Sequence, residues 1–561
     1  MGMAAANSSN NRWLFGPVRD LVFGCGLLYA ALVPIYAFWG TEIRQAQPGF
    51  LMALLVIAFS MPHYGATLLR VYEQRRERRR YALFAVHSTL AILALSVFGL
   101  YDSFVGSLLT TVYLTWSPWH YTGQNYGIAV MFLRRRGLNP TPAAKRLLYG
   151  SFFFSFLTAL LVMHSGSEFG YGFAQFDGGD VRFLPLGWST SLVLFAAPLS
   201  SALSIACLIA ASVLLARVGR LRDLIPTWTL ALTQALWFSV PFLLAFYGRD
   251  TGIGPLDAQS TSVPDFQIWI WVSHGIQYIW ITTFYARAEK SWRSYGSYFG
   301  KILLAGSAIW TLPAILFAPA ALGVRSYDAG LALVIASAVN IHHFILDGAI
   351  WKLRRSRVAA VLIRDSHAEA TTAEPEEDSR ARNRWLRRVV WGTTVAGLLS
   401  TAFVFEQRQF AYRGARNRGD IAATDRILDR LAWFGRDDED WRLALGATAE
   451  RQRDFAMALS QYEKSLALRP SVEVLEKVGW VGMRTREWRE AAKAYDKILA
   501  IDPNHADALL GGGIARLKLS ESESARALLE RAAKLRPDHE TTRQALAEAN
   551  EQLAAETSED G

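Results

Sequence analysis

Four short motifs place histidine inside stretches of the sequence that are otherwise apolar. The motifs are MPHY at residues 61–64, PWHYTGQN at 118–125, SHGIQY at 273–278 and NIHHFILD at 340–347. An ionisable side chain is costly at membrane depth and by default marks a functional site. Imidazole nitrogens are common ligands of iron, copper and zinc, and three or four of them can leave a coordination position open. We therefore expect a buried transition-metal site.

Each motif contributes at least one candidate metal ligand, and the last motif contributes two. Neighbouring side chains on a helix point about 100° apart, so we expect only one ring of the His342–His343 pair to face the site. His343 is preferred because it shares a helix face with Asn340 and Asp347. Iron is the expected metal, with zinc or copper as alternatives. The full set of candidate ligands is His63, His120, His274, His342 and His343.

Polar side chains follow three of these histidines by four residues, which places them on the same helix face. Groups in this position can fix the tautomer of an imidazole and orient its metal-binding nitrogen. The carboxylate of Asp347 could also bind the metal directly, as in histidine–carboxylate iron sites. The pairs with this spacing are His120–Gln124, His274–Tyr278 and His343–Asp347. We expect catalytic or proton-transferring roles for Asp347, Gln124, Gln277 and Tyr278.

Two further histidines lie in or beside apolar segments but are expected to be structural. His87 is followed four residues later by Ala91, which offers no polar group. His164 lies at the end of its apolar segment, away from the other motifs. These two histidines are therefore suitable controls for the metal site.

The motifs require membrane-spanning helices to position them. About 20 apolar residues in a helix cross a hydrocarbon core roughly 30 Å thick, and the sequence contains eleven segments that we read as such spans. The first of them follows a polar segment and lacks a small-residue cleavage pattern, so we expect an anchor rather than a signal peptide. The predicted spans are 18–38, 49–70, 81–100, 103–133, 147–165, 187–214, 227–247, 266–286, 301–322, 329–351 and 388–406.

The net charge of +10 does not indicate nucleic-acid binding, because the basic residues cluster after alternate predicted spans. RRERRR at 75–80 and RRR at 134–136 are two of these clusters, and the intervening loops are poor in Lys and Arg. Such asymmetry follows the positive-inside rule. It predicts a multi-pass protein of a bacterial-type inner membrane, with a cytoplasmic N-terminus and a non-cytoplasmic C-terminal domain.

These observations predict an all-α fold with a sharp change of character near residue 407. Apolar runs dominate before that point, and charged residues alternate with Ala and Leu after it. The expected organisation is a cytoplasmic segment at 1–17, a polytopic membrane domain at 18–352, a cytoplasmic linker at 353–387, a last transmembrane helix at 388–406 and a soluble domain at 407–561.

The C-terminal part contains an internal repeat with a period of 33 or 34 residues. Each unit carries a small residue in one helix, an alanine and a larger apolar residue in the next, and a closing proline. This pattern resembles the tetratricopeptide repeat (TPR), and the resemblance implies an α-solenoid that docks a protein partner. The repeated positions are Gly446, Gly479 and Gly513; Ala458, Ala491 and Ala525; Tyr462, Tyr495 and Leu529; and Pro470, Pro503 and Pro537.

The membrane part resembles, in general logic, the multi-histidine membrane enzymes that act on lipids and carotenoids, such as the membrane desaturases. It lacks the paired His-x-x-His boxes of the desaturases, and no specific family is matched. The resemblance implies a metal-dependent, oxygenase-like oxidoreductase with a lipid-like or isoprenoid substrate. Two alternatives stay open: a non-enzymatic assembly protein for envelope glycan or lipid biogenesis, and a bis-histidine haem protein for electron transfer.

Overall fold

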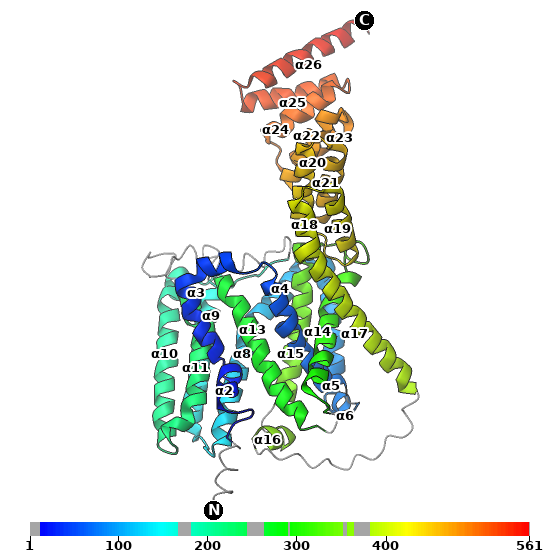
Figure 1. The fold of residues 1–561 in the computed structure, drawn as a ribbon. Helices are drawn as coiled ribbons and strands as arrows, with labels where there is room; N and C mark the ends of the chain where they lie inside the picture. The colour runs from blue at the N-terminus through cyan, green and yellow to red at the C-terminus, as the bar shows by residue number, and fades with distance from the viewer. Residues whose placement is uncertain are drawn as a thin grey trace, which may run out of the picture. The chain divides into compact units, whose positions relative to one another are not determined.

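The protein is helical and forms two compact units (Figure 1). The first unit is Met1–Ile315 with Gly330–Phe405, and the second is Leu316–Ala329 with Glu406–Gly561. Within the described residues the only pairing of strand type is an isolated bridge between Ser165 and Trp188, so the expected all-α fold is confirmed. Most of the predicted segments 1–17 and 353–387 lie outside the residues that this computed structural model describes, which are 12–73, 75–165, 181–243, 263–289, 292–351, 356–363 and 382–559.

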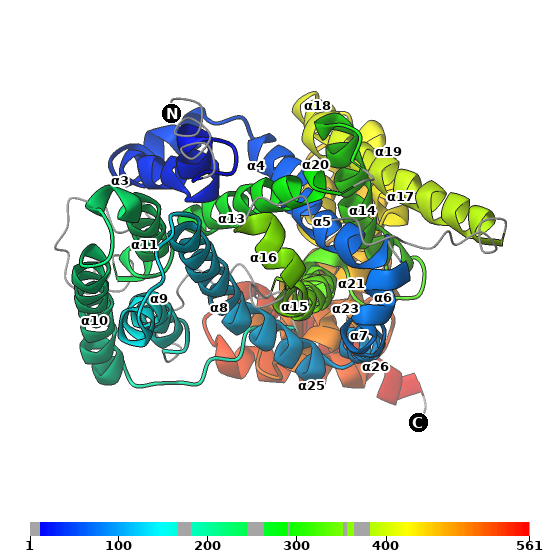
Figure 2. The ribbon, with the colours of Figure 1, turned by 90° about the horizontal axis from the view of Figure 1, so that it is seen from below.

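The first unit is a bundle in which α8 is central. Helix α8 packs against α7, α9, α11 and α15, and α13 packs against α5 and the π-helical turn η2 (Figure 2). Helix α8 runs without a break through Pro118. The elements of this unit are α2 (Pro17–Arg19), η1 (Asp20–Gly24), α3 (Leu27–Ala46), α4 (Leu51–Leu55), η2 (Val56–Ser60), α5 (Met61–Tyr72), α6 (Arg75–Arg80), η3 (Leu83–His87), α7 (Ser88–Tyr101), α8 (Ser103–Arg135), α9 (Pro142–Met163), α10 (Thr190–Ala216), η6 (Leu221–Leu224), α11 (Ile225–Phe238), α13 (Val263–Arg287), α14 (Tyr295–Leu316), α15 (Ala332–Ile350), α16 (Ser356–Leu362) and α17 (Arg382–Glu406). The turn η7 (Tyr327–Leu331) begins in the second unit and ends in the first.

Seven helices in the described part of the chain are long and apolar enough to cross a membrane. The other predicted spans are also largely helical, but they do not reach the same length and mean hydropathy. Helices α8 and α13 are long enough, and they carry the polar and aromatic residues of two histidine motifs, which lower their hydropathy. The seven helices are Leu51–Tyr72, Leu83–Tyr101, Pro142–Met163, Thr190–Ala216, Tyr295–Leu316, Tyr327–Ile350 and Arg388–Asn417.

Several of the segments predicted to face the cytoplasm meet at one end of the first unit. Arg135, in the last turn of α8, donates hydrogen bonds of 2.9 Å to the carbonyl oxygens of Leu362 and Trp13. Arg12 forms an ion pair of 3.1 Å with Asp223. The start of the described chain, the end of α8, the start of α11 and the end of α16 therefore share one end of the bundle.

The second unit is built from helix pairs whose close contacts explain the sequence repeat. A Cβ atom added at Gly446 would lie 2.5 Å from the ring of Tyr462, and one added at Gly479 would lie 2.7 Å from the ring of Tyr495. The small residue of one helix thus receives the large residue of the next. The helices are α18 (Tyr412–Asn417), α19 (Ile421–Trp433), α20 (Glu439–Arg451), α21 (Phe455–Leu468), α22 (Val472–Thr485), α23 (Trp488–Ile501), α24 (Ala506–Leu517), α25 (Ser522–Leu535) and α26 (Glu540–Glu559), with the turn η8 (Gln407–Ala411) before them.

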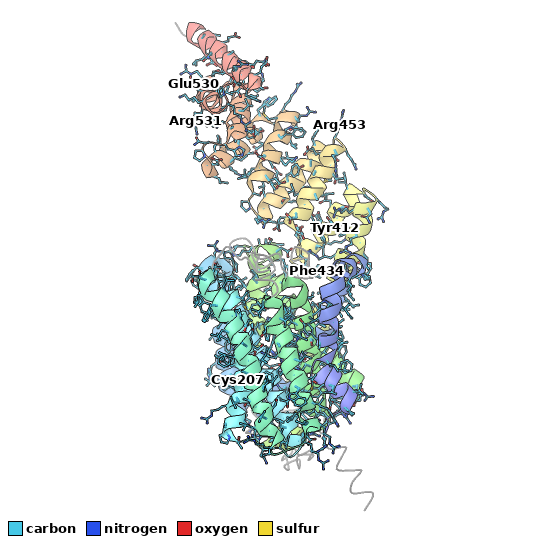
Figure 3. The ribbon with its side chains drawn as sticks, turned by 90° about the vertical axis from the view of Figure 1, so that its left-hand side faces the viewer. Cys207, Tyr412, Phe434, Arg453, Glu530 and Arg531 are labelled. Atoms are coloured by element: carbon cyan, nitrogen blue, oxygen red, sulfur yellow. The ribbon has the colours of Figure 1, made fainter. Side chains whose placement is uncertain are left out.

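The turn inside each helix pair repeats a feature that the sequence motif did not include. Arg453, labelled in Figure 3, Arg486 and Ser520 all have a left-handed backbone, with φ of 61°, 65° and 59°. They lie at equivalent places, after α20, α22 and α24 respectively. The three pairs therefore share a turn geometry as well as a packing contact.

A buried arginine joins α19 to the helix pairs. The side chain of Arg442 in α20 is 1 % exposed and contacts Asp425 and Asp429 of α19, each at 2.9 Å. It also bonds Asp437, where burial raises the pKa of the carboxyl although the bond to Arg442 opposes this effect. Removing one partner of a buried ion pair is strongly destabilising, so α19 is an integral part of the second unit.

Candidate metal centre

Four helices of the first unit each bring one histidine to a common point. His63 lies on α5, His120 on α8, His274 on α13 and His343 on α15. One ligand nitrogen from each of these side chains lies within 4.8 Å of all the others. The structure therefore brings together one histidine from each of the four sequence motifs.

His63 and His343 are in direct contact at the centre of this group. Their Nε2 atoms lie 2.8 Å apart, and the two residues are 3 % and 2 % exposed. His63 follows the π-helical turn η2 and also hydrogen-bonds to the backbone of Ser60 in that turn. Short π-helical segments are frequent at functional sites, and here one immediately precedes the helix that carries a candidate ligand.

The other two histidines have nitrogens without hydrogen-bond partners. Among the described residues, neither nitrogen of His274 has a partner, and the Nε2 atom of His120 has none. The ring of His274 stacks on Tyr121, with centroids 3.9 Å apart. A buried polar group without a partner costs free energy, so these nitrogens are held where a ligand would satisfy them.

The four imidazoles fit a transition-metal ion. Two nitrogens bound to one zinc ion lie at most about 4 Å apart, because each Zn–N bond is about 2.0–2.1 Å long. The nitrogens of this group lie within 4.8 Å of one another, which is close to the spacing that a single metal ion requires. Iron and copper also accept imidazole ligands, so the donor set restricts the class of metal but not its identity.

A carboxylate stands beside the histidines. The Oδ2 atom of Asp347 lies 3.4 Å from the Nε2 atom of His343 and 3.8 Å from that of His120. Its Oδ1 atom accepts hydrogen bonds from the hydroxyls of Tyr278, at 2.6 Å, and Thr67, at 3.1 Å. One oxygen of the carboxylate is thus anchored by donors, and the other faces the two imidazoles.

Tyr278 and Thr67 extend this arrangement by one layer. The indole of Trp351 donates to the Tyr278 hydroxyl at 3.1 Å. The Thr67 hydroxyl lies 2.6 Å from that hydroxyl and 2.9 Å from the Nδ1 atom of His343. Hydrogen bonds to the second nitrogen of an imidazole orient metal-ligating histidines, and Thr67 occupies that position for His343.

The two glutamines predicted for the site belong to a neighbouring amide network. Gln124 donates to Gln277 at 2.5 Å, and Gln277 donates to Asn125 at 3.0 Å. Asn125 in turn donates to Gln234 at 3.0 Å. The i+4 spacing therefore pairs His343 with Asp347, whereas the polar groups of Gln124 and Tyr278 bond residues other than the histidines four positions before them.

Three other histidines of the described first unit, His87, His164 and His342, do not belong to the group. His342 points away from its neighbour His343, and its Nε2 atom lies 3.0 Å from the hydroxyls of both Tyr72 and Thr89. It is therefore not one of the four convergent ligands, as the helix geometry predicted for one member of this pair. His87 is exposed, and His164 bonds Thr115 at 2.9 Å.

Two residues that the sequence analysis did not select belong to the site. Thr67 lies four residues after His63, and Trp351 lies four residues after Asp347. The spacing that indicated Asp347, a polar group four positions after a histidine on a helix, also indicates Thr67, whereas Trp351 follows a carboxylate and not a histidine.

A cavity of about 380 Å³ opens beside the histidines. Its polar wall is formed by His120, Gln124, Tyr278 and Asp347, and its other walls are largely apolar and aromatic. Ligand sites are usually concave, mostly apolar and equipped with a few polar groups. The four-histidine group thus has a space next to it in which a second molecule could bind.

No protein-family model matches the chain, and neither a curated protein nor a solved structure is significantly similar to it.

Proposed function

We propose that the protein is an integral-membrane metalloenzyme that acts on a lipophilic substrate. One observation carries the proposal: four histidines from four helices converge, two of them with buried nitrogens that lack partners, next to a cavity with a polar wall. A group of histidines that only joined helices would satisfy its own nitrogens. The preferred reaction class is oxygenase-like oxidoreduction, which follows from the resemblance to multi-histidine membrane enzymes.

The proposed metal ligands are His63, His120, His274 and His343. A bound metal would supply Lewis-acid or redox chemistry in a site of low dielectric constant. Asp347 is suited to hold or move a proton at Oδ2, because Tyr278 and Thr67 already occupy its other oxygen. Since Trp351 donates to the Tyr278 oxygen, the Tyr278 hydroxyl hydrogen stays directed at Asp347.

Metal analysis of the purified protein tests this proposal. We expect stoichiometric iron, zinc or copper in the full-length chain, and a severalfold loss after His63→Ala, His120→Ala, His274→Ala or His343→Ala. His342→Ala is the matched control, because His342 is also buried and lies next to His343 but bonds Tyr72 and Thr89. His164→Ala is a second control in a different helix.

Two results would refute the metal assignment. One is wild-type protein that is folded and free of any stoichiometric transition metal. The other is an equal effect of all six substitutions, which would point to a general loss of structure. The same samples test the haem alternative, because a Soret band in the absorption spectrum would identify haem.

The topology and the second unit complete the proposal. Eleven spans would place the chain after residue 406 on the non-cytoplasmic side, and the meeting of Arg135, Leu362 and Trp13 at one end of the bundle supports a common face for the predicted cytoplasmic segments. The second unit would be a TPR solenoid that docks a protein partner. The glycine–aromatic contacts of its helix pairs support this assignment.

A non-enzymatic scaffold is the second candidate, and one observation favours it. The chain Gln124–Gln277–Asn125–Gln234 joins α8, α13 and α11 without a metal. Buried amides of this kind hold helices together within membranes. Folded protein that contains no stoichiometric transition metal would favour this candidate.

A further inference from the structure

We infer that the cavity beside the four histidines binds a single linear hydrocarbon chain of a lipid, with the distal part of the chain toward the histidines. The inference deepens the proposed function by naming the substrate class, but the binding step does not require a metal. It rests on three observations. The cavity runs along one face of α8, glycines leave part of its wall without side chains, and its polar and apolar linings are separate.

The cavity follows one face of α8. Trp116, His120, Gly123, Gly127 and Met131 all line it, and their spacing of three or four residues defines a single helix face. The rise from His120 to Met131 is roughly 16 Å. This length is close to half the thickness of a hydrocarbon core, which is roughly 30 Å. The groove therefore matches the length of one lipid chain in one leaflet.

Three glycines line this groove and leave part of its wall without side chains. A Cβ atom added at Gly123, Gly127 or Gly348 would meet nothing within 4 Å, and all three residues line the cavity. Side chains at these places would project into free space rather than into a neighbouring helix. The glycines on α8 and α15 therefore make room for a ligand and not for helix contact.

The groove changes in character along α8. Its polar part contains Asp347 and His120, whose Nε2 atom has no hydrogen-bond partner among the described residues. Farther along, the lining is Ile128, Met131 and Leu362. Burying polar groups against such a surface without partners is unfavourable, so this part of the groove suits a hydrocarbon rather than a sugar or a nucleotide.

The position of the basic residues sets the direction of the chain. Arg135 donates a hydrogen bond of 2.9 Å to the carbonyl oxygen of Leu362, at the apolar end of the groove. Arg134 and Arg135 also form the last turn of α8. A polar or anionic headgroup is favoured next to these residues. The histidines then face carbons far from the headgroup.

Photocrosslinking of the full-length protein in phosphatidylcholine nanodiscs tests the inference. The probes are palmitate with a diazirine near its methyl end and a farnesol derivative with a terminal diazirine. We expect crosslinks to concentrate in the α8 and α15 segments around His120 and Asp347. Substitution Gly127→Leu or Gly123→Leu should lower this labelling severalfold, while Gly300→Leu should leave it unchanged, because Gly300 on α14 is equally open but does not line the cavity.

The two probes separate acyl from isoprenoid chains, and preferential labelling by either one supports the inference. Labelling that is unchanged in both Gly127→Leu and Gly123→Leu would overturn it. So would labelling spread evenly over lipid-exposed helices such as α10. Metal content, measured on the same samples, separates the two proposals: site-specific labelling of metal-free wild-type protein would retain the groove and reject the metalloenzyme.

Discussion

The hydroxyl of Thr67 lies between His343, one of the proposed metal ligands, and the carboxylate of Asp347. It lies 2.9 Å from the Nδ1 atom of His343, 3.1 Å from Asp347 and 2.6 Å from the hydroxyl of Tyr278. A single side chain therefore sets the orientation of an imidazole and of the acid beside it.

Replacing this hydroxyl by a methyl group is the first prediction at this scale. Thr67→Val should weaken metal binding about 10- to 100-fold, as the loss of groups that orient metal ligands typically does. Thr67→Ser should restore most of the affinity, because it keeps the hydroxyl. Competition with a chromogenic chelator measures the affinity.

The control for this variant is Thr89→Val. Thr89 bonds His342, which lies outside the four-histidine group, at 3.0 Å. Equal losses of affinity in Thr67→Val and Thr89→Val would show that the effect is a general destabilisation. A Thr67→Ser variant as weak as Thr67→Val would show that the hydroxyl is not the cause.

Individual residues also show which features of the candidate site could be predicted from the sequence. The preference for His343 over His342 followed from the helix face that His343 shares with Asn340 and Asp347, and in the structure His343 belongs to the four-histidine group whereas His342 does not. The role of Gln124 did not follow, because its partner Gln277 lies on another helix. Helix periodicity determines which residues share a face, but only packing determines what that face meets.

At the scale of helices, the site depends on the close approach of α5 to α14. A Cβ atom added at Gly65 would overlap the backbone carbonyl of Ile302, and one added at Gly306 would overlap that of Met61. Met61 is the first residue of α5 and precedes His63 by two positions. This glycine contact therefore helps to set the depth at which α5 presents its histidine.

We predict that Gly306→Ala destabilises the bundle by about 1–3 kcal/mol, the usual cost of forcing extra atoms into a packed interior. Thermal unfolding in detergent measures the change, and metal content should fall with it. The matched control is Gly300→Ala on the same helix, where an added Cβ atom meets nothing within 4 Å. Alanine is a better helix former than glycine, so this control should be neutral or stabilising.

The repeat turns provide a prediction for the second unit. A left-handed backbone costs an ordinary residue roughly 1–2 kcal/mol, and Arg486 has this conformation with φ of 65°. Arg486→Gly should therefore raise the stability of the unit by roughly 1 kcal/mol after the loss of chain entropy is included. Lys493→Gly, at an exposed position within α23, should instead lower the stability of the unit by about 1 kcal/mol. Unfolding by denaturant measures the stability of both variants.

The turn conformation shows a limit of sequence patterns. The repeat of Gly446, Gly479 and Gly513 predicted helix pairs, since a small residue opposite a large one is visible in the sequence. The left-handed residues are Arg453, Arg486 and Ser520, which share no chemical property that signals this backbone.

At the scale of the whole molecule, two arrangements differ in their number of membrane crossings. The seven helices of sufficient length and hydropathy and the eleven predicted spans are both odd in number. Either count places the N-terminus and the repeats on opposite sides of the membrane. With the predicted cytoplasmic N-terminus, the loop with RRERRR at 75–80 separates the two counts, because only the eleven-span arrangement then puts it on the cytoplasmic side.

We predict that Arg79→Cys is labelled by a membrane-impermeant maleimide only from the cytoplasmic side. The experiment uses a background in which Cys25 and Cys207, the only native cysteines, are replaced. Arg79 is exposed in the structure, so the thiol is accessible once its side of the membrane is reached. Labelling in intact spheroplasts, from the outer side, would reject the eleven-span arrangement.

The cavity walls belong to helices proposed to lie within a membrane, and this placement has a consequence for kinetics. A ligand that enters from the lipid phase is already abundant in the bilayer, so its supply depends on its mole fraction among lipids. Saturation should then follow surface dilution of the substrate by inert lipid rather than its bulk concentration. Selection among chains would come from the shape of the groove, because every lipid tail is equally apolar.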